Sequence, residues 1–219
     1  SVPAGVTQVD TSLGYYDSPA TCGLLASLQV TCWGTGPTGN SIKSGPIEID
    51  GLTNVAQVDL GNMHGCARLI PGPIECWGGG YAPVLGNASV TGSTTPVDSV
   101  VISDSKQITA GGFFTCLIRQ DSTVNCWGKN DHGKLGDGQI AVDSTIPVVT
   151  LGVSGATQVS AGSDHACAVL TLGGIKCWGQ SEHGEIGGGA LGTFPLAVTV
   201  QGISDAVQVS AGVQRTCAV

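Results

Sequence analysis

The chain has 219 residues, enough for one or two domains with an ordinary core. Its 35 glycines and 10 prolines approach the content of disordered chains, but 41% hydrophobic and only 11% charged residues are the opposite of the disordered balance. This composition is typical of many short strands joined by tight turns, and no stretch approaches the roughly 18 apolar residues of a membrane-spanning helix. The formal net charge of −8 makes nucleic acid and anionic membranes poor partners, so we expect neither nucleic-acid binding nor membrane insertion.

Two markers recur along the chain at one period. Five glutamines, each followed by Val or Ile, lie 49, 50, 51 and 50 residues apart: Gln8, Gln57, Gln107, Gln158 and Gln208. Four cysteine pairs have the same offset of ten residues, and Trp-Gly follows the second member of each: Cys22/Cys32, Cys66/Cys76, Cys116/Cys126 and Cys167/Cys177. The chain is therefore a tandem array, with repeats predicted at about 6–55, 56–105, 106–156 and 157–206 and a partial repeat at 207–219.

The first two repeats are irregular. The first carries about five extra residues, within LGYYDSPAT, and reads TGPTGNSIKSG after its Trp-Gly. The second has GGYAPV where the later repeats have a charged loop. Because repeat proteins tend to specialise at non-repeated features, we predict that Tyr15, Tyr16 and Tyr81 contact a ligand.

The fourth repeat shows the expected elements most clearly. A strand at 157–162 precedes alternating strands at 166–170 and 175–179, which a short Gly-containing turn joins into a hairpin. A Gly-rich loop and a fourth extended segment, FPLAVTV, follow. Four strands in about 50 residues match one blade of a β-propeller and do not suit helical or leucine-rich repeats. The predicted fold is all-β, with four blades and the start of a fifth.

The cysteine offset places each pair across a hairpin. Opposed residues of an antiparallel hairpin have a constant index sum, so Cys167 opposite Cys177 places the turn at 171–173. We predict four disulfides, with zinc ligation and free buried thiols as the alternatives. Cys217 lacks its partner ten residues on, so we expect that the chain is part of a longer one or that another chain supplies the missing strands.

The remaining candidates for chemistry have structural interpretations. His64 and His165 share one repeat position and His132 and His183 another, so blade spacing keeps them from converging on a metal. The Gly-rich loops lack a P-loop ending, and no nucleophile motif occurs. We expect no catalytic residue, no metal and no cofactor. The four tryptophans are predicted to pack between blades: Trp33, Trp77, Trp127 and Trp178.

The repeat resembles that of the regulator of chromosome condensation family. Residues 106–155 and 157–202 match best, through the Trp-Gly, Asn130 and the KLGDG loop at 134–138. The resemblance implies a β-propeller, usually of seven blades, and the paired cysteines are similar to those of the family's secreted bacterial branch. The founding member is a nucleotide exchange factor that binds chromatin. This chain is acidic and has no Lys/Arg cluster, so chromatin binding does not carry over, and disulfides disfavour a nuclear role.

These observations favour a non-catalytic recognition module that presents loops to a protein, with a glycan as the other partner class. One alternative is a self-assembling fibre or surface-layer component that uses its open strand at 207–219. A second is a secreted enzyme inhibitor, a role known within the family. The expected location is extracellular or at the cell surface, the periplasm being the other oxidising compartment.

Overall fold

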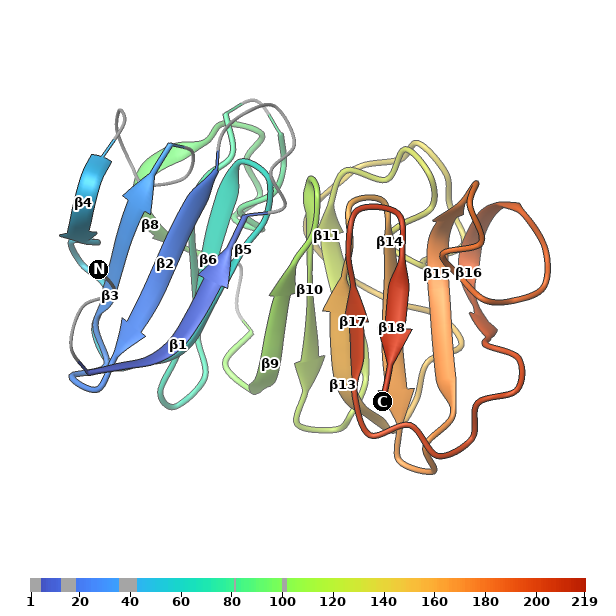
Figure 1. Ribbon diagram of the computed structural model, residues 1–219. Coiled ribbons are helices and arrows are strands. Elements are labelled where there is room, and N and C mark those ends of the chain that lie inside the picture. The colour runs from blue at the N-terminus through green and yellow to red at the C-terminus, as the bar shows by residue number, and fades with distance from the viewer. Residues whose placement is uncertain (1–4, 13–18, 36–42, 81, 100–101) are drawn as a thin grey trace.

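The computed structural model describes residues 5–12, 19–35, 43–80, 82–99 and 102–219. Tyr15, Tyr16 and Tyr81, the predicted ligand contacts, lie outside the described residues. The described residues form eighteen strands in five antiparallel sheets, which stand side by side across the molecule in Figure 1. Within these ranges we find no helix long and apolar enough to cross a membrane.

Each of the first four sheets is one four-stranded blade, with its strands in chain order. Blade 1 contains β1 (Val6–Thr11), β2 (Ala20–Leu25), β3 (Val30–Gly34) and β4 (Lys43–Glu48). Blade 2 contains β5 (Val55–Leu60), β6 (His64–Leu69), β7 (Ile74–Gly78) and β8 (Ser93–Asp98). Blade 3 contains β9 (Ser105–Ala110), β10 (Phe114–Arg119), β11 (Val124–Gly128) and β12 (Ser144–Val149). Blade 4 contains β13 (Ala156–Ala161), β14 (His165–Leu170), β15 (Ile175–Ser181) and β16 (Gly192–Thr199), and blade 5 has β17 (Val209–Ala211) and β18 (Thr216–Ala218).

The central hairpin of each complete blade has the register that the cysteine spacing predicts. Cys167 lies opposite Cys177, and Ala168 opposite Lys176, and the other three hairpins repeat this pairing. All four predicted cysteine pairs are disulfides, with Cα–Cα distances of 4.0–4.1 Å. This close approach is typical of a non-hydrogen-bonded pair in an antiparallel ladder. Cys217, on β18, is free and exposed.

The blades stack through their first strands. β1 contacts β5, β5 contacts β9, β9 contacts β13 and β13 contacts β17, so the first strand of each blade lies nearest the common centre. The second strands reach across as well, from β2 to β5, β6 to β9, β10 to β13 and β14 to β17. Consecutive blades therefore meet at a repeated interface, which we call a seam, and the fourth strands lie on the outside (Figure 1).

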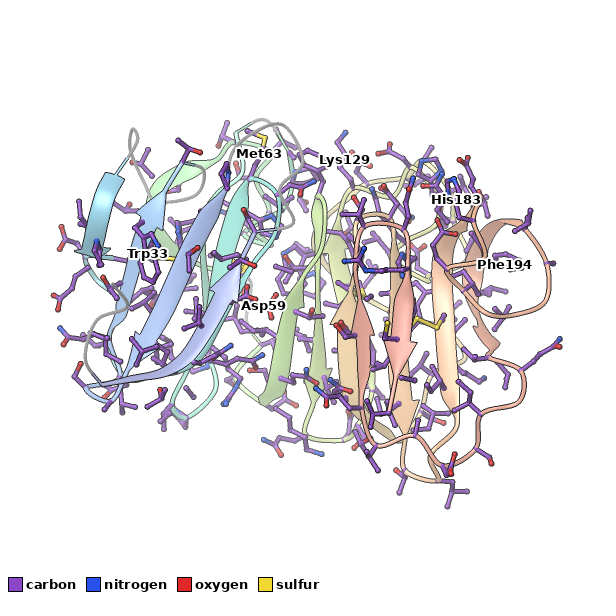
Figure 2. All side chains as sticks on the ribbon, in the orientation of Figure 1. Trp33, Asp59, Met63, Lys129, His183 and Phe194 are labelled. Atoms are coloured by element: carbon purple, nitrogen blue, oxygen red, sulfur yellow. A yellow bond between two sulfur atoms is a disulfide. The ribbon has the colours of Figure 1, made fainter. Side chains whose placement is uncertain are left out.

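Three of the tryptophans fill these seams. Trp77 joins the blade 1 core, Trp127 that of blade 2 and Trp178 that of blade 3, and all three are fully buried. Each indole therefore packs on the blade before its own. Trp33 is only half-buried, because the described residues place no other blade against this side of blade 1 (Figure 2).

The glycine after each tryptophan is a requirement of the backbone. Gly179 has φ of 102°, and a Cβ there would overlap the carbonyl oxygen of Asp164 in the neighbouring loop. Only glycine combines this φ with so close an approach. In the Trp-Gly marker, the tryptophan therefore packs in a seam and the glycine allows close contact between the third strand and the start of the second strand.

Candidate binding face

The longest loops of blades 2, 3 and 4 gather at one end of the molecule. In an antiparallel blade the turn between strands one and two and the loop between strands three and four emerge at the same end. We call this end the loop face: it carries 61–63, 111–113, 162–164 and 212–215, and the longer loops 79–92, 129–143 and 182–191. Figure 2 shows Met63, Lys129 and His183 along it. The opposite end, the hairpin face, carries the short turns between the second and third strands.

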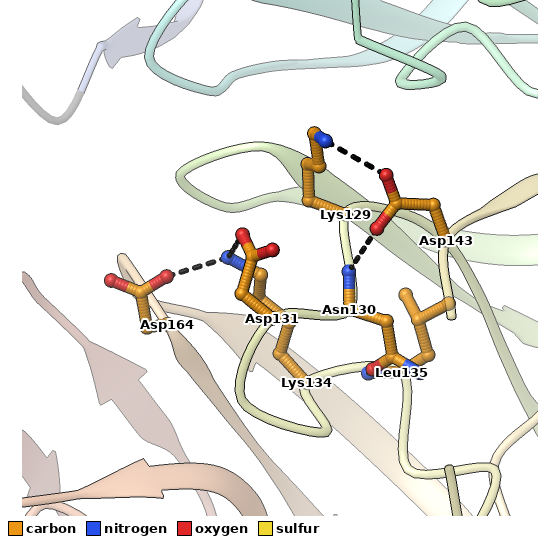
Figure 3. Close-up of polar contacts among 7 residues, drawn as sticks. All are labelled: Lys129, Asn130, Asp131, Lys134, Leu135, Asp143 and Asp164. Atoms are coloured by element: carbon orange, nitrogen blue, oxygen red, sulfur yellow. Dashed lines mark hydrogen bonds and ion pairs between the residues drawn. The ribbon is translucent and has the colours of Figure 1, made fainter. Parts of the chain in front are cut away.

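The blade 3 loop is ordered around one buried side chain, Asn130. Its Oδ1 accepts the Leu135 N–H at 3.1 Å, and its Nδ2 donates to Asp137 Oδ1 and to the Gln139 carbonyl, both at 3.2 Å. Its own backbone N–H donates to Asp143 Oδ1 at 3.0 Å, as Figure 3 shows. A buried amide with this many partners holds a fifteen-residue loop without regular structure in one conformation.

A buried lysine joins blade 3 to blade 4 beneath this loop. Lys134 is 1% exposed, and its Nζ lies 2.6 Å from Asp164 Oδ1 and 3.8 Å from Asp131 Oδ2 (Figure 3). The same ammonium lies 5.9 Å from the centre of the Phe114 ring. Because burying a lone ammonium is costly, the two carboxylates, and Asp164 above all, offset the burial of Lys134 at this position.

Blade 4 has the opposite charge at the same repeat position. Glu185 is buried, accepts the His183 backbone N–H at 2.8 Å and lies 3.3 Å from the His183 ring Nδ1. Burial alone would raise the pKa of Glu185, but hydrogen bonds from its own and the His183 N–H and from the His183 ring outweigh it and lower the pKa. Blade 2 has Val84 at this position. One backbone frame therefore holds a buried neutral, a buried basic and a buried acidic side chain in consecutive blades.

The loop face as a whole is acidic. Its described loops hold six carboxylates and three cationic side chains: Asp131, Asp137, Asp143, Asp164, Glu182 and Glu185 against Lys129, Lys134 and Arg215. Lys134 is sequestered by two of these carboxylates. The exposed loops consequently favour a positively charged surface as a partner.

The seams beneath this face are closed by hydrogen bonds that the sequence does not reveal. The periodic glutamine of each blade reaches onto the first strand of the next: Gln107 Nε2 donates to the Val159 carbonyl and its Oε1 accepts the Val159 N–H, both at 2.9 Å. The same two bonds join Gln8 to Val58, Gln57 to Ile108 and Gln158 to Val209. The marker that revealed the repeat is thus an inter-blade clamp.

The two buried histidines also close seams. His64 Nε2 lies 2.8 Å from Thr115 Oγ1, and His165 Nε2 lies 2.8 Å from Thr216 Oγ1, each a contact with the next blade. Burial lowers the pKa of His64 to about 3 and also lowers that of His165, although Glu185 and Asp164 oppose the latter shift. The shared His-to-Thr offset of 51 residues could have identified both pairs from the sequence.

Two aspartates close the first seams near the centre. Asp10 Oδ2 accepts the Leu60 N–H at 2.6 Å, and Asp59 Oδ1 accepts the Ala110 N–H at 2.7 Å. Burial raises the pKa of Asp10 to about 6, and burial together with the Asp10 charge raises the pKa of Asp59 well above its ordinary value. The described residues contain no group of three or more His, Cys, Asp or Glu side chains that could hold a metal. His132 and His183 lie apart in the loops of blades 3 and 4.

Comparison with known proteins agrees with this architecture. Two models of the regulator of chromosome condensation (RCC1) repeat match, one at residues 106–134 and 156–185 and the other at 121–169. The probable E3 ubiquitin-protein ligase HERC6 of Homo sapiens is 30% identical over 64% of this chain and 14% of its own length. The chain spans less than half of the length of the curated relatives it matches.

Solved structures show the same fold. Prp20p from Saccharomyces cerevisiae, described with its binding properties to Gsp1p and histones, covers the whole chain with a TM-score of 0.86 and 18% identity, and the match takes in 56% of that protein. The ectodomain of the Physcomitrella patens receptor kinase CR4 covers 91% of the chain at 25% identity and a TM-score of 0.54, over 46% of its own length. With the four-stranded blades and the repeat markers, these matches show RCC1 repeats within residues 106–185 and the β-propeller fold of RCC1-like proteins in a disulfide-bonded array.

Proposed function

We propose that the chain is an extracellular, non-catalytic module that binds a protein through its loop face. The observation that carries this proposal is the combination of a repeated rigid frame with loops of unlike charge. Clamps and disulfides recur in each blade, whereas the half-buried loop position 87/137/188 changes from Asn to Asp to Gly. Recognition residues are commonly placed on loops that a rigid scaffold positions.

The disulfides support an extracellular location. Four cross-strand disulfides in one chain form and persist in oxidising compartments and are rare in the cytosol. The similar CR4 structure is the ectodomain of a receptor kinase, which is an extracellular setting for this fold.

A protein partner agrees with the chemistry of the face and with the relatives. Prp20p, which has the same fold, is described as binding other proteins, including histones. The acidic excess on the loop face favours a partner whose contact surface carries lysines and arginines. We favour a protein over a glycan because the described loops of this face offer few aromatic rings for sugar stacking.

Two exposed ion pairs provide a matched test of the face. Lys129 and Asp143 lie 2.8 Å apart on the loop face, with side chains 36% and 32% exposed. Arg119 and Asp104 lie 3.1 Å apart near the hairpin face, with side chains 38% and 37% exposed. The double variants K129A/D143N and R119A/D104N each remove one positive and one negative charge, so the net charge is unchanged, and Asp143→Asn keeps an oxygen that can accept the Asn130 N–H. Each exposed pair contributes roughly 0–1 kcal/mol, so both variants are expected to fold.

The experiment compares the three proteins as immobilised baits. The extracellular fraction of the source is passed over each, and retained proteins are quantified by mass spectrometry. We expect a defined set of proteins retained by the wild type and by R119A/D104N and reduced about tenfold on K129A/D143N, as for the loss of about 1.4 kcal/mol of binding free energy. Equal retention by all three baits would place binding elsewhere, and retention only from the cytosolic fraction would contradict the extracellular assignment.

A further inference from the structure

A cavity of about 300 Å³ lies between blade 4 and the two strands of blade 5. Its apolar wall comes from blade 4 and includes Ile175, Ile186 and Ile203. Its other wall comes from residues 214–216 and 218 of blade 5, and residues 183–187 border it at the loop face. The cavity is therefore a feature of the last seam of the array.

The equivalent space in the preceding seams holds a tryptophan. In blade 3 the residues at these positions are Val124, Leu135 and Val153, and they pack in one cluster with Trp178 of blade 4. In blade 2 they are Ile74, Leu85 and Ile102, and they pack with Trp127 of blade 3. The blade 4 cluster contains Ile175 and Ile186 but no indole among the described residues, and Ile203 lies at its border. The last seam thus has the lining of a tryptophan site.

The polar contact of the indole is also prepared. The N–H of Trp127 donates to the Val84 carbonyl at 2.8 Å, and that of Trp178 donates to the Lys134 carbonyl at 2.9 Å. The same position in blade 4 is Glu185, whose carbonyl accepts the Thr216 hydroxyl at 2.9 Å. A carbonyl oxygen has two lone pairs, so Glu185 can accept an indole N–H as well.

The edge of β18 completes the site. Gln208 and Val219 exchange backbone hydrogen bonds, and Gly212 N–H donates to the Arg215 carbonyl. The alternation of an antiparallel ladder then directs the backbone groups of Thr216 and Ala218 to the open side of β18. Cys217, exposed and free, occupies the register position of the first cysteine in each disulfide.

We call the cavity and the adjacent open side of β18 the blade 5 groove. We propose that this groove binds an extended strand that carries a Cys-Trp-Gly sequence, like those of β3, β7, β11 and β15. The strand pairs antiparallel with β18, its indole fills the cavity and donates to the Glu185 carbonyl, and its cysteine forms a disulfide with Cys217. This assignment is independent of the partner on the loop face.

The bond-forming step is a thiol–disulfide exchange. A peptide with the sequence of residues 174–181 (GIKCWGQS) is prepared with its cysteine as a mixed disulfide with glutathione. The Cys217 thiolate attacks the peptide sulfur, the peptide–glutathione bond breaks and the peptide–Cys217 bond forms. Glutathione leaves as a thiolate and takes up the proton that Cys217 lost.

The test measures the rate at which Cys217 of the full chain acquires the peptide, by intact and tryptic mass spectrometry. The control peptide is GIKCAGQS, which keeps the cysteine and the backbone and lacks the indole. We expect the tryptophan peptide to be captured at least about tenfold faster, since burying an indole favours the aligned complex. Equal rates for the two peptides would overturn the proposal.

Protein variants localise the effect. Ile203→Arg places a charged side chain in the cavity wall and should abolish the difference between the peptides, whereas Leu172→Arg, at a hairpin tip 91% exposed, should preserve it. The peptide comparison uses wild-type protein, so it stands even if Ile203→Arg does not fold. Faster formation of a Cys217–Cys217 dimer than of the peptide adduct would assign the groove to a second copy and contradict the proposal.

Discussion

The glutamine clamp allows a quantitative test of how the blades hold together. Gln107→Ala removes both hydrogen bonds between the Gln107 amide and the Val159 backbone. Val159 is 1% exposed, so its N–H and carbonyl remain buried without those partners. Each of the two unsatisfied buried groups costs about 1–3 kcal/mol, so the variant should lose about 2–6 kcal/mol of unfolding free energy. The loss concerns the seam between blade 3, which carries Gln107 on β9, and blade 4, which carries Val159 on β13.

The chain contains its own control for this change. Gln208 has the same repeat position on blade 5, but it is exposed, and no described residue of another blade lies against it to accept its hydrogen bonds. Gln208→Ala should change the unfolding free energy by less than about 0.5 kcal/mol, as for an ordinary surface substitution. Urea unfolding of both variants with the disulfides intact, followed by tryptophan fluorescence, gives the two values. Equal losses would show that the clamp hydrogen bonds do not stabilise the seam.

Three further changes probe the seams and the disulfides. Burial holds the pKa of His64 near 3 against an ordinary 6.5, so the stability that neutral His64 contributes is present above pH 6.5 and is lost as the pH falls, by at most about 5 kcal/mol. The double variant H64F/T115A copies Phe114 and Ala166, which occupy the same positions in the next seam. In urea titrations it should lose less stability than wild type between pH 6.5 and 4. Asp59 has a raised pKa in the folded state, so protonated Asp59 stabilises the fold at low pH, and this stability is lost as the pH rises through the folded-state pKa. Asp59→Asn can still accept the Ala110 N–H, so it should raise the thermal midpoint at pH 8 and leave it unchanged near pH 3. An equal shift at both pH values would count against this account. The double variant C116S/C126S, which removes the Cys116–Cys126 disulfide, should lower the unfolding free energy by about 3 kcal/mol in calorimetry or urea titration. A change below about 1 kcal/mol would show that this disulfide does not stabilise the blade.

Much of each blade could be predicted because its information is local. The offset between Cys167 and Cys177 sets the hairpin register by simple arithmetic, and the structure has that register in all four blades. The four disulfides follow from it, since opposed residues of a non-hydrogen-bonded pair bring their side chains together.

The seams could not be predicted, because they join residues about 50 positions apart. Gln107 and Val159 are 52 residues apart, and their contact depends on how far one blade is rotated from the next. No rule of hairpin register determines that rotation. Periodicity showed that the glutamine recurs, but only the packed blades show that its amide extends the ladder across each seam.

The loop face contains features that could be predicted from the sequence and features that could not. The loop at 134–138 was predicted from the Gly-rich sequence, yet the burial of Lys134 against Asp164 depends on the following blade. Trp33 and Trp178 stand in the same sequence context, but Trp178 packs on another blade and is buried, whereas the described residues place no blade over Trp33, which is half-buried. Identical motifs therefore differ in environment according to their place in the array.

The extracellular assignment is tested most directly by the oxidation state of the cysteines in protein taken from its natural source. Cells are lysed into an excess of alkylating reagent, and each cysteine is assigned by mass spectrometry before and after reduction. We predict that Cys22, Cys32, Cys66, Cys76, Cys116, Cys126, Cys167 and Cys177 react only after reduction and that any cysteine reactive before it is Cys217. Alkylation of the four pairs before reduction would contradict the assignment to an oxidising, extracellular compartment.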